Sequence, residues 1–417
     1  MFRVLTGAWA LFLGMMLLQV GNGMQGTLLG IRGAIEGFTT LELSVIMSAY
    51  FVGFLFGSRL APQMIRRVGH VRVFAALGSM ISAVMILYPT VTDPWAWAIG
   101  RVVIGFCFSG VFVTAESWLN NTATNGTRGK ALSAYMIVQM VGLVTAQGLI
   151  VLADPAGYVL FVIPCVLVSL SFAPILLSVS PTPSFETTKP LSLFQIMKIS
   201  PLGCVGMFLT GGVFAAQFGM AAVYGSEAGL TVEQISIFVA SFYVAAVVAQ
   251  YPLGWLSDRM DRRILIAIVS LITGIGAVIG MMLGDIFWFL LLASVLIGGS
   301  SNPLYSLLIA YTNDFLDHDD MAAAAGGMLF INGFGAIAGP LMLGWMMGII
   351  GPGGYFLYIA ILMFAMVVYA VYRMTQRPGQ GVSPTDSYAP VMPSASPVAV
   401  EFAQEIAVEA AQNEKAA

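Results

Sequence analysis

Long apolar runs, each able to cross a bilayer, fill the first 375 residues of the chain. A membrane-spanning helix needs about 20 mostly apolar residues. The runs are continuous rather than alternating, which indicates helices and excludes a β-barrel. The first run is too long for a cleaved signal peptide, so we expect it to be retained. The twelve expected spans are residues 5–28, 41–61, 71–91, 95–116, 131–152, 156–178, 201–224, 234–256, 264–284, 286–311, 322–348 and 354–374.

The Lys and Arg residues concentrate in alternate loops between these runs. With both termini in the cytoplasm, fifteen of the seventeen cations fall on the inner side. Arg32 is the exception in the outer loops, and Arg101 lies within a span. This bias follows the positive-inside rule. We therefore predict a multi-pass protein of the bacterial inner membrane with both ends cytoplasmic.

The composition agrees with this picture and excludes several other classes. Hydrophobic residues make up 59% of the chain and charged residues 9%, against about 25% charged in a soluble domain. A soluble enzyme and a nucleic-acid binder are thereby excluded, because there is too little charge to cover a surface or neutralise phosphates. The three cysteines lie in apolar runs without metal-binding spacing. We expect no enzymatic activity, no cofactor and no metal.

Landmark residues recur at a nearly constant offset, which indicates an internal repeat. Gly57 and Gly254 are 197 residues apart, as are Gly142 and Gly339, while Glu116 and Asp314 are 198 apart. Parallel repeats of this kind are typical of transporters, whose site lies between the repeats near the midplane. The fold class that we predict is an all-α polytopic membrane protein with twelve transmembrane helices in two pseudo-symmetric six-helix bundles.

The domain boundaries follow from changes in composition. Residues 179–200 form the longest interior break and are rich in Pro, Ser and Thr, as linkers are. After Gln376 the chain becomes rich in Pro, Ser and acidic residues, which predicts disorder, although residues 398–411 could form a short acidic helix. We predict one bundle at 1–180, a cytoplasmic linker at 181–200, the second bundle at 201–375 and a disordered cytoplasmic tail at 376–417.

Three motifs connect the chain to a known family. The run Gly254-x-x-x-Asp258-Arg259-x-x-Arg262-Arg263 resembles the G-x-x-x-D-R-x-G-R-R signature of the major facilitator superfamily, with Asp261 in place of a glycine. Its first-half copy keeps Gly57, Arg66 and Arg67 but lacks the acidic residue, and Arg101-x-x-x-Gly105 resembles the motif of the fourth span. The resemblance covers residues 1–375, particularly to a bacterial sugar- and drug-transporter-like branch. It implies alternating access around a central cavity.

The charged motif residues are candidates for a conformational latch. A contact that forms in one access state and breaks in the other biases the equilibrium between the states. By symmetry, Asp258 would meet the region near Arg128, and Arg66 or Arg67 would meet Glu116. The alternative is that these residues only set the topology and cap helices. The latch candidates are Gly57, Arg66, Arg67, Glu116, Arg128, Gly254, Asp258, Arg259, Arg262 and Asp314.

Arg101 is the single cation expected inside a span. Such a charge costs several kcal/mol unless it faces water or a partner. Three roles remain open: packing against backbone carbonyls or a carboxylate such as Glu36 or Asp93, binding of an anionic substrate or coupling, and extension of the side chain toward the membrane surface.

Uncharged polar residues are the other candidates for the cavity. Gln19, Asn22 and Gln25 are spaced three apart and so share one face of the first helix. Each polar residue could equally serve as a contact between helices. With Arg101, the candidates are Gln19, Asn22, Gln25, Tyr135, Gln139, Gln217, Tyr243, Asn302, Tyr305 and Asn332.

These features favour a secondary transporter that moves a small organic solute or drug-like molecule by alternating access. The partners expected are that solute, protons if transport is coupled, and the lipid bilayer, with the protein as a monomer. Coupling stays open, because the spans hold almost no carboxylate and both histidines, His70 and His318, are expected in loops. The alternative function is a non-transporting membrane sensor or assembly factor of the same fold.

Overall fold

The computed structural model describes residues 2–122, 128–177, 192–316, 318–376, 388, 390–393, 395, 396, 398–400, 402 and 403. The described residues form helices and no strand. The elements are α1 (Phe2–Ile35), α2 (Thr40–Val68), α3 (His70–Leu87), α4 (Pro94–Thr122), α5 (Arg128–Ile150), α6 (Val159–Leu177), α7 (Leu193–Ile199), α8 (Pro201–Ala215), the π-helical turn η1 (Ala216–Met220), α9 (Ala221–Glu227), α10 (Val232–Ser257), α11 (Arg262–Leu283), α12 (Phe287–Asn313), α13 (His318–Ile350) and α14 (Gly354–Gln376).

Every predicted span corresponds to a helix, and the all-α fold class is confirmed. The seventh span is the one composite case, because α8, η1 and α9 follow one another without a loop. Ten helices among the described residues are long and apolar enough to cross a membrane. Prolines inside helices, such as Pro303 in α12 and Pro340 in α13, do not end them.

One helix was not predicted, because it lies in the segment interpreted as a linker. The short helix α7 begins after Ser192, whose side chain accepts a hydrogen bond from the Gln195 N–H, while the Gln195 side chain accepts one from the Ser192 N–H. This reciprocal capping box satisfies two backbone donors at the helix start. The Ser-x-x-Gln pattern is visible in the sequence and could have indicated this helix.

Contacts divide the chain into two compact units. The first unit is residues 1–187, 215–240 and 340–352, and the second is residues 188–214, 241–339 and 353–417. The bundles at 1–180 and 201–375 are a different division, made from the sequence repeat, and they stay a prediction. The two units are described separately below.

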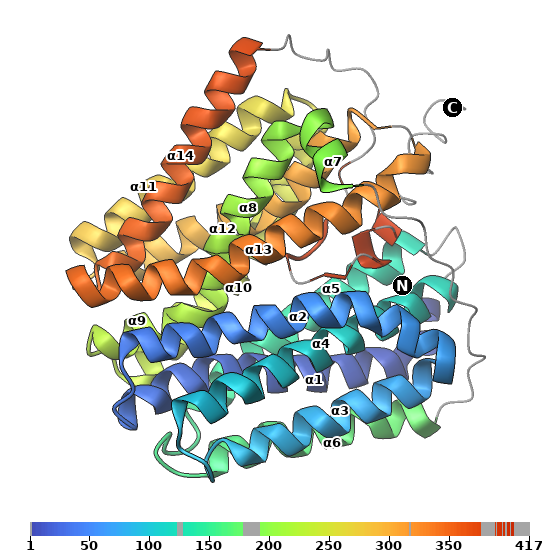
Figure 1. The fold of residues 1–417 in the computed structure, drawn as a ribbon, viewed down its shortest axis with the longest axis vertical. Coiled ribbons are helices and arrows are strands. Elements are labelled where there is room, and N and C mark those ends of the chain that lie inside the picture. Colours follow the sequence, from blue (N-terminus) through green and yellow to red (C-terminus); the bar gives the residue numbers. More distant parts are fainter. Residues whose placement is uncertain are drawn as a thin grey trace. The chain divides into compact units, whose positions relative to one another are not determined.

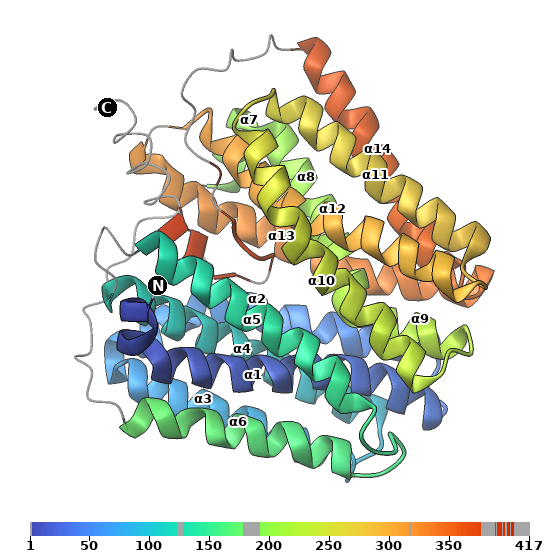
Figure 2. The same ribbon diagram turned by 180° about the vertical axis from the view of Figure 1, so that it is seen from behind.

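In the first unit, α2 and α4 form the closest pair of helices. Figure 1 and Figure 2 both show α3 beside α6, and α1 packs against α5 and α6. The pair α2 and α4 can approach because glycines face backbone across it. A Cβ at Gly53 would overlap the carbonyl oxygen of Val102, and one at Gly105 would overlap that of Tyr50. Small residues permit this kind of close approach inside membranes.

In the second unit, α11 packs against both α12 and α14 (Figure 1). A close glycine contact also joins α13 to α8. A Cβ at Gly335 would overlap the carbonyl oxygen of Phe208, and a Cβ at Gly339 would lie 3.0 Å from the Cα of Gly212. The close helix packing predicted for Gly335 and Gly339 is therefore made against α8.

Candidate functional site

The polar stripe of α1 lies inside the first unit and makes contact with α5. Gln19, Asn22 and Gln25 are each at most 2% exposed. The Gln19 Nε2 donates a hydrogen bond of 2.8 Å to the Gln139 Oε1, and the Asn22 Nδ2 donates one of 3.2 Å to the Gln19 Oε1. The spacing of three thus places the amides in reach of one another, as expected for one helix face.

This row of amides continues through α2 to Arg101 on α4. The Tyr50 hydroxyl donates a hydrogen bond of 3.5 Å to the Asn22 Oδ1. The Arg101 guanidinium carbon lies 4.7 Å from the centre of the Tyr50 ring, a cation–π distance. We call the five residues Gln139, Gln19, Asn22, Tyr50 and Arg101 the polar chain; it joins α5, α1, α2 and α4.

Several buried polar atoms beside or within the polar chain have no hydrogen-bond partner among the described residues. They are the Nε and Nη1 of Arg101 and both amide atoms of Gln25 and of Gln147. The Arg101 Nη2 reaches the Met47 Sδ at 3.4 Å, a weak acceptor. Leaving buried donors unsatisfied costs free energy, more so for a charged group. The polar chain therefore has free capacity for hydrogen bonds.

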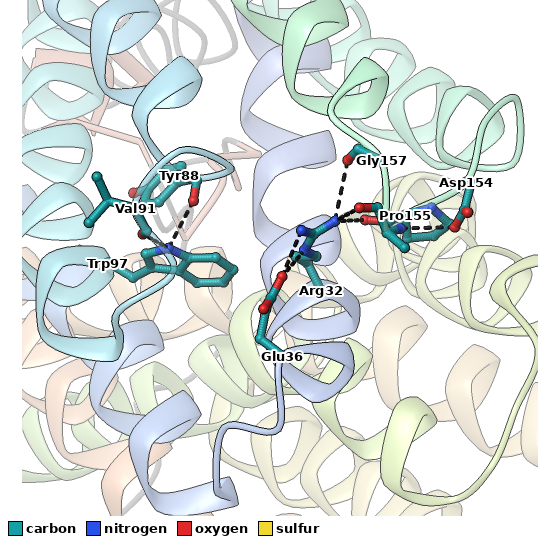
Figure 3. Close-up of polar contacts among 9 residues, drawn as sticks. Arg32, Glu36, Tyr88, Val91, Trp97, Asp154, Pro155 and Gly157 are labelled. Atoms are coloured by element: carbon teal, nitrogen blue, oxygen red, sulfur yellow. Dashed lines mark hydrogen bonds and ion pairs between the residues drawn. The ribbon is translucent and has the colours of Figure 1, made fainter.

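The carboxylates proposed as partners of Arg101 are engaged elsewhere. Glu36 pairs with Arg32 at 2.6 Å, and Asp93 accepts a 2.8 Å hydrogen bond from the Ala96 N–H at the start of α4. Arg32 also donates to backbone carbonyls of the loop between α5 and α6, among them that of Pro155 at 3.0 Å (Figure 3). These contacts fasten the end of α1 to that loop.

The side chain of Trp97 holds the turn between α3 and α4. The Trp97 indole N–H lies 2.8 Å from the carbonyl oxygen of Val91 and 3.1 Å from that of Tyr88 (Figure 3). Trp97 is 1% exposed. Its ring therefore anchors the beginning of α4, one turn before Arg101.

The π-helical turn η1 lies against the polar chain within the first unit. The ring of Phe218 is 5.5 Å from that of Tyr50, and a Cβ at Gly219 would lie 3.1 Å from the Cβ of Met47. Gln217 in the same turn is buried. Single π turns inside α-helices occur frequently at functional sites. The sequence contains no pattern from which we predicted this turn.

The two asparagine candidates of the second unit bind backbone carbonyls. The Asn302 Nδ2 donates to the Gly298 carbonyl of its own helix at 3.1 Å, and the Asn332 Nδ2 donates to the Met207 carbonyl of α8 at 3.1 Å. Tyr243 and Tyr305 are both buried. The structure thus joins the Gln19, Asn22, Arg101 and Gln139 candidates into one chain through Tyr50.

Among the latch candidates of the second unit, Arg262 lies at the centre of a charged cluster. It pairs with Asp314, donates to the Ala310 carbonyl at 3.0 Å and to the Ser257 hydroxyl at 3.2 Å, and lies 3.7 Å from Asp258. Arg262 is 4% exposed. The cluster ties the ends of α10, α11 and α12 together.

The other motif residues of the second unit have separate contacts. Arg259 lies over the Trp255 ring at 4.3 Å and donates to the carbonyl of that residue at 3.1 Å. Asp261, which replaces the motif glycine, accepts from the Arg263 N–H at 2.9 Å and pairs with its guanidinium at 2.6 Å. Asp261 therefore caps α11, a role that sequence reasoning missed although Asp before a helix is a common N-cap.

The latch candidates of the first unit are arranged differently. Glu116, 1% exposed, accepts a 3.2 Å hydrogen bond from the Tyr135 hydroxyl. A Cβ at Gly57 would overlap the carbonyl oxygen of Phe106, so that glycine serves helix packing. Arg66 and Arg67 are exposed at the end of α2. The side chain of Arg128 lies outside the described residues.

Both histidines expected in loops are instead the first residues of helices, His70 of α3 and His318 of α13. His70 is the first residue of α3, is 1% exposed, and its Nε2 is 3.0 Å from the Ser117 hydroxyl. The preceding Gly69 has a φ of 85°. This left-handed conformation suits glycine, and it allows α3 to begin directly after α2.

The chain matches one protein family along most of its length. The model of the Major Facilitator Superfamily matches residues 11–231 and 202–402. Among curated relatives, the uncharacterized MFS-type transporter YcaD of Salmonella arizonae is 23% identical over 372 residues, which cover 88% of this chain and 96% of the relative. The corresponding YcaD of Escherichia fergusonii is 25% identical over 355 residues, covering 84% and 91%.

Solved structures with the same fold include transporters of sugars and nucleosides. A variant of the nucleoside transporter NupG superposes with a TM-score of 0.75 at 14% identity, covering 87% of this chain and 98% of that one. A D-xylose–proton symporter gives a TM-score of 0.68 at 15% identity, covering 90% and 98%. At this level of identity the similarity shows the fold alone.

Proposed function

The chain belongs to the major facilitator superfamily, and on that premise we propose that it is a secondary transporter that moves a small organic solute by alternating access. The observation that carries the proposal is the polar chain. Polar side chains are expensive within a membrane and tend to mark solute or ion pathways. Here four helices contribute such side chains to one connected row, and atoms of Arg101 stay available for hydrogen bonds.

The location and coupling belong to the same proposal. The distribution of Lys and Arg supports insertion in the bacterial inner membrane with both termini in the cytoplasm, and a monomer is part of the same proposal. Within the spans, Glu116 is the buried carboxylate that could take up a proton, and its neighbour is the Tyr135 hydroxyl. Proton coupling through Glu116 and uncoupled facilitated diffusion are the two modes to be separated. The D-xylose–proton symporter with the same fold makes the coupled mode the first to test.

The experiment is solute uptake into proteoliposomes, with and without an imposed pH gradient. Solutes are first selected by their ability to raise the melting temperature of the purified protein. We expect at least one stabilising solute to cross the membrane, and Gln19→Leu to slow its transport. Glu116→Gln should abolish the effect of the pH gradient if coupling runs through that residue. If no stabilising solute crosses the membrane, the chain acts as a sensor or assembly factor and the transporter proposal is wrong.

A further inference from the structure

Arg101 is a fully buried cation with donors left over. It is 0% exposed, and its Nε and Nη1 have no hydrogen-bond partner among the described residues. Its recorded contacts are the Tyr50 ring at 4.7 Å and the Met47 sulfur at 3.4 Å. A guanidinium presents its N–H groups as a planar fork that matches a carboxylate. Tyr50 and Met47 leave that fork largely unused.

The surroundings of Arg101 supply no opposite charge in the described part of the chain. The ionisable groups that act on it are the phenols of Tyr50 and Tyr88. Glu36 and Asp93 are bound elsewhere, as described above. Glu116 is fifteen residues further along α4, about 22 Å away at 1.5 Å per residue. A buried charge without a counter-charge is strongly unfavourable, so a ligand that brings a negative charge would relieve the cost.

We propose that Arg101 binds the anionic group of the transported solute, so that the substrate class is small organic anions, carboxylates first. This inference rests on the proposed transport function. The amides of Asn22, Gln19 and Gln139 would then hydrogen-bond the uncharged polar part of the same molecule. The polar chain is buried in this structure, with Phe218 of η1 against Tyr50 and Met47 beside Arg101.

The test compares acids with their uncharged amides on the purified full-length protein. The probes are small aliphatic and aromatic carboxylates, each paired with its amide, for example nicotinate with nicotinamide and lactate with lactamide. We expect at least one acid to raise the melting temperature and to bind roughly tenfold or more tightly than its amide, which corresponds to about 1.4 kcal/mol. Arg101→Gln should remove this preference, and Arg101→Lys should keep it in weaker form, because a point charge replaces the fork.

Controls separate binding from folding and from transport. Arg373→Gln makes the same chemical change on α14 and should leave the preference for the acid intact. Where Arg101→Gln is poorly folded, Arg101→Lys keeps a buried cation and still tests the proposal, because it should weaken the preference for the acid. The proposal is overturned if no carboxylate stabilises the protein, or if Arg101→Gln keeps the preference. If acids bind through Arg101 but none is transported, the anion site stands and the transport proposal fails.

An independent observation concerns the segment after α14. We call its described residues, 388, 390–393, 395, 396, 398–400, 402 and 403, the tail segment; most of them are buried, in a region whose composition predicts disorder. The Tyr388 hydroxyl lies 2.9 Å from the Gln250 Nε2, and the Tyr388 N–H donates to the Asp258 Oδ1 at 2.9 Å. The Val391 N–H and carbonyl both bond to the Ser306 hydroxyl, at 2.8 and 2.9 Å.

The tail segment binds one face of α10 together with α12. Gln250, Gly254 and Asp258 are spaced four apart and so form a row on α10. Gly254 makes room for the bound ring, because a Cβ there would lie 2.7 Å from the Tyr388 Cδ1. The same glycine and aspartate belong to the family-like motif between the eighth and ninth spans. In this state, the Asp258 carboxylate is held by the tail segment as well as by Arg262.

We propose that the tail segment is an autoinhibitory strap that restrains α10 against α12 within the second unit. Transport requires helices to change their contacts between states, and a strap that binds two of them favours the state in which it is bound. Undocking of Tyr388 and Val391 would release Asp258 and speed the cycle. Docking of the tail segment and its effect on the rate of transport are measured separately. The inhibitory role can therefore prove wrong even if docking is confirmed.

The variants are a chain without residues 377–417, a control chain without residues 404–417, and Tyr388→Ala. Hydrogen exchange at residues 250–258 should rise in the first and third, and stay unchanged in the control. Without the strap, solute transport should be about tenfold faster, which corresponds to about 1.4 kcal/mol of lost binding free energy of the strap. A synthetic peptide of residues 386–403 should slow transport again. Unchanged exchange overturns docking, and unchanged or slower transport with raised exchange overturns inhibition.

Discussion

The amide side chains that are cavity candidates make different contacts in the two units of the molecule. In the first unit, amide side chains bond to one another across helices, and Arg101 and Gln25 keep unsatisfied atoms. In the second unit, Asn302 and Asn332 each bond to a backbone carbonyl. A side chain that is bound to backbone strengthens a helix contact and has less left to offer a ligand. Under the proposed transport function, this difference favours the polar chain of the first unit as the place of solute recognition.

The charged residues differ in the same direction. The buried cations make different contacts, because Arg101 lies over the Tyr50 ring whereas Arg262 pairs with Asp314. The close glycine contacts, by contrast, occur in both units. Close helix approach through glycine is thus common to both units, whereas among the described residues Arg101 has no ion pair and Arg262 lies in an ion cluster.

The largest expected effect comes from opening that ion cluster. Asp314→Ala leaves Arg262 buried without its closest carboxylate, and breaking a buried pair costs about 3–5 kcal/mol. Gln139→Leu in the first unit removes one hydrogen bond between uncharged amides, so we expect a loss of about 1 kcal/mol. Melting temperatures of both variants in the same detergent provide the measurement. Equal losses would remove the contrast between the units.

The glycine contacts should show the opposite, namely equal effects in the two units. Gly53→Ala and Gly335→Ala each place a methyl group against a backbone carbonyl, and overpacking costs about 1–3 kcal/mol. Gly148→Ala is the matched control, since nothing lies within 4 Å of its Cβ position, and there alanine should stabilise the helix. Thermal unfolding of the three variants tests this. A much smaller cost at Gly335 would mean that α13 and α8 adjust more freely than α2 and α4.

Much of this comparison could be predicted from the sequence. Continuous apolar runs locate the spans, because a bilayer fixes the length of a helix. The spacing of Gln19, Asn22 and Gln25 predicts one helix face, which is what the structure contains. The GxxxG pattern at Gly335 predicts a close helix contact. These features depend on local spacing, which the sequence displays directly.

Other parts depend on contacts between distant residues, which a single sequence does not display. Symmetry predicts that Asp258 meets the region near Arg128, whose side chain lies outside the described residues, and it does not predict the contacts of Asp258 with Arg262 and with the backbone of Tyr388. The tail segment has the composition of a disordered region. Its contacts include backbone groups of Tyr388 and Val391, and amino-acid composition does not predict backbone contacts. The π turn at η1 likewise depends on how the seventh span packs.

The polar chain predicts a moderate effect that should be confined to the first unit. The Gln19–Gln139 hydrogen bond should couple Gln19→Leu and Gln139→Leu by about 0.6 kcal/mol, and by no more than about 1.7, in a double-mutant cycle. Asn332→Leu, which breaks a side chain–backbone contact, should not couple to either. Both single variants of the polar chain should also slow transport, while Asn332→Leu should chiefly lower stability. Coupling between Gln19 and Asn332 would contradict the separation of roles.

The smallest expected effect concerns the cap of α11, where the second unit holds charge near the membrane surface. Burial raises the pKa of Asp261, but hydrogen bonds and attraction from Arg263 outweigh it and hold that pKa below its ordinary value of 3.8. The carboxylate therefore contributes stability that is fully present above that value and lost as the pH falls through the lowered pKa. Asp261→Asn keeps a capping side chain and removes only the charge, so it should cost about 0.3–1 kcal/mol at neutral pH. The difference in melting temperature between the two proteins should vanish in strong acid, and a difference that instead grows in acid would show that Asp261 acts by its shape rather than its charge.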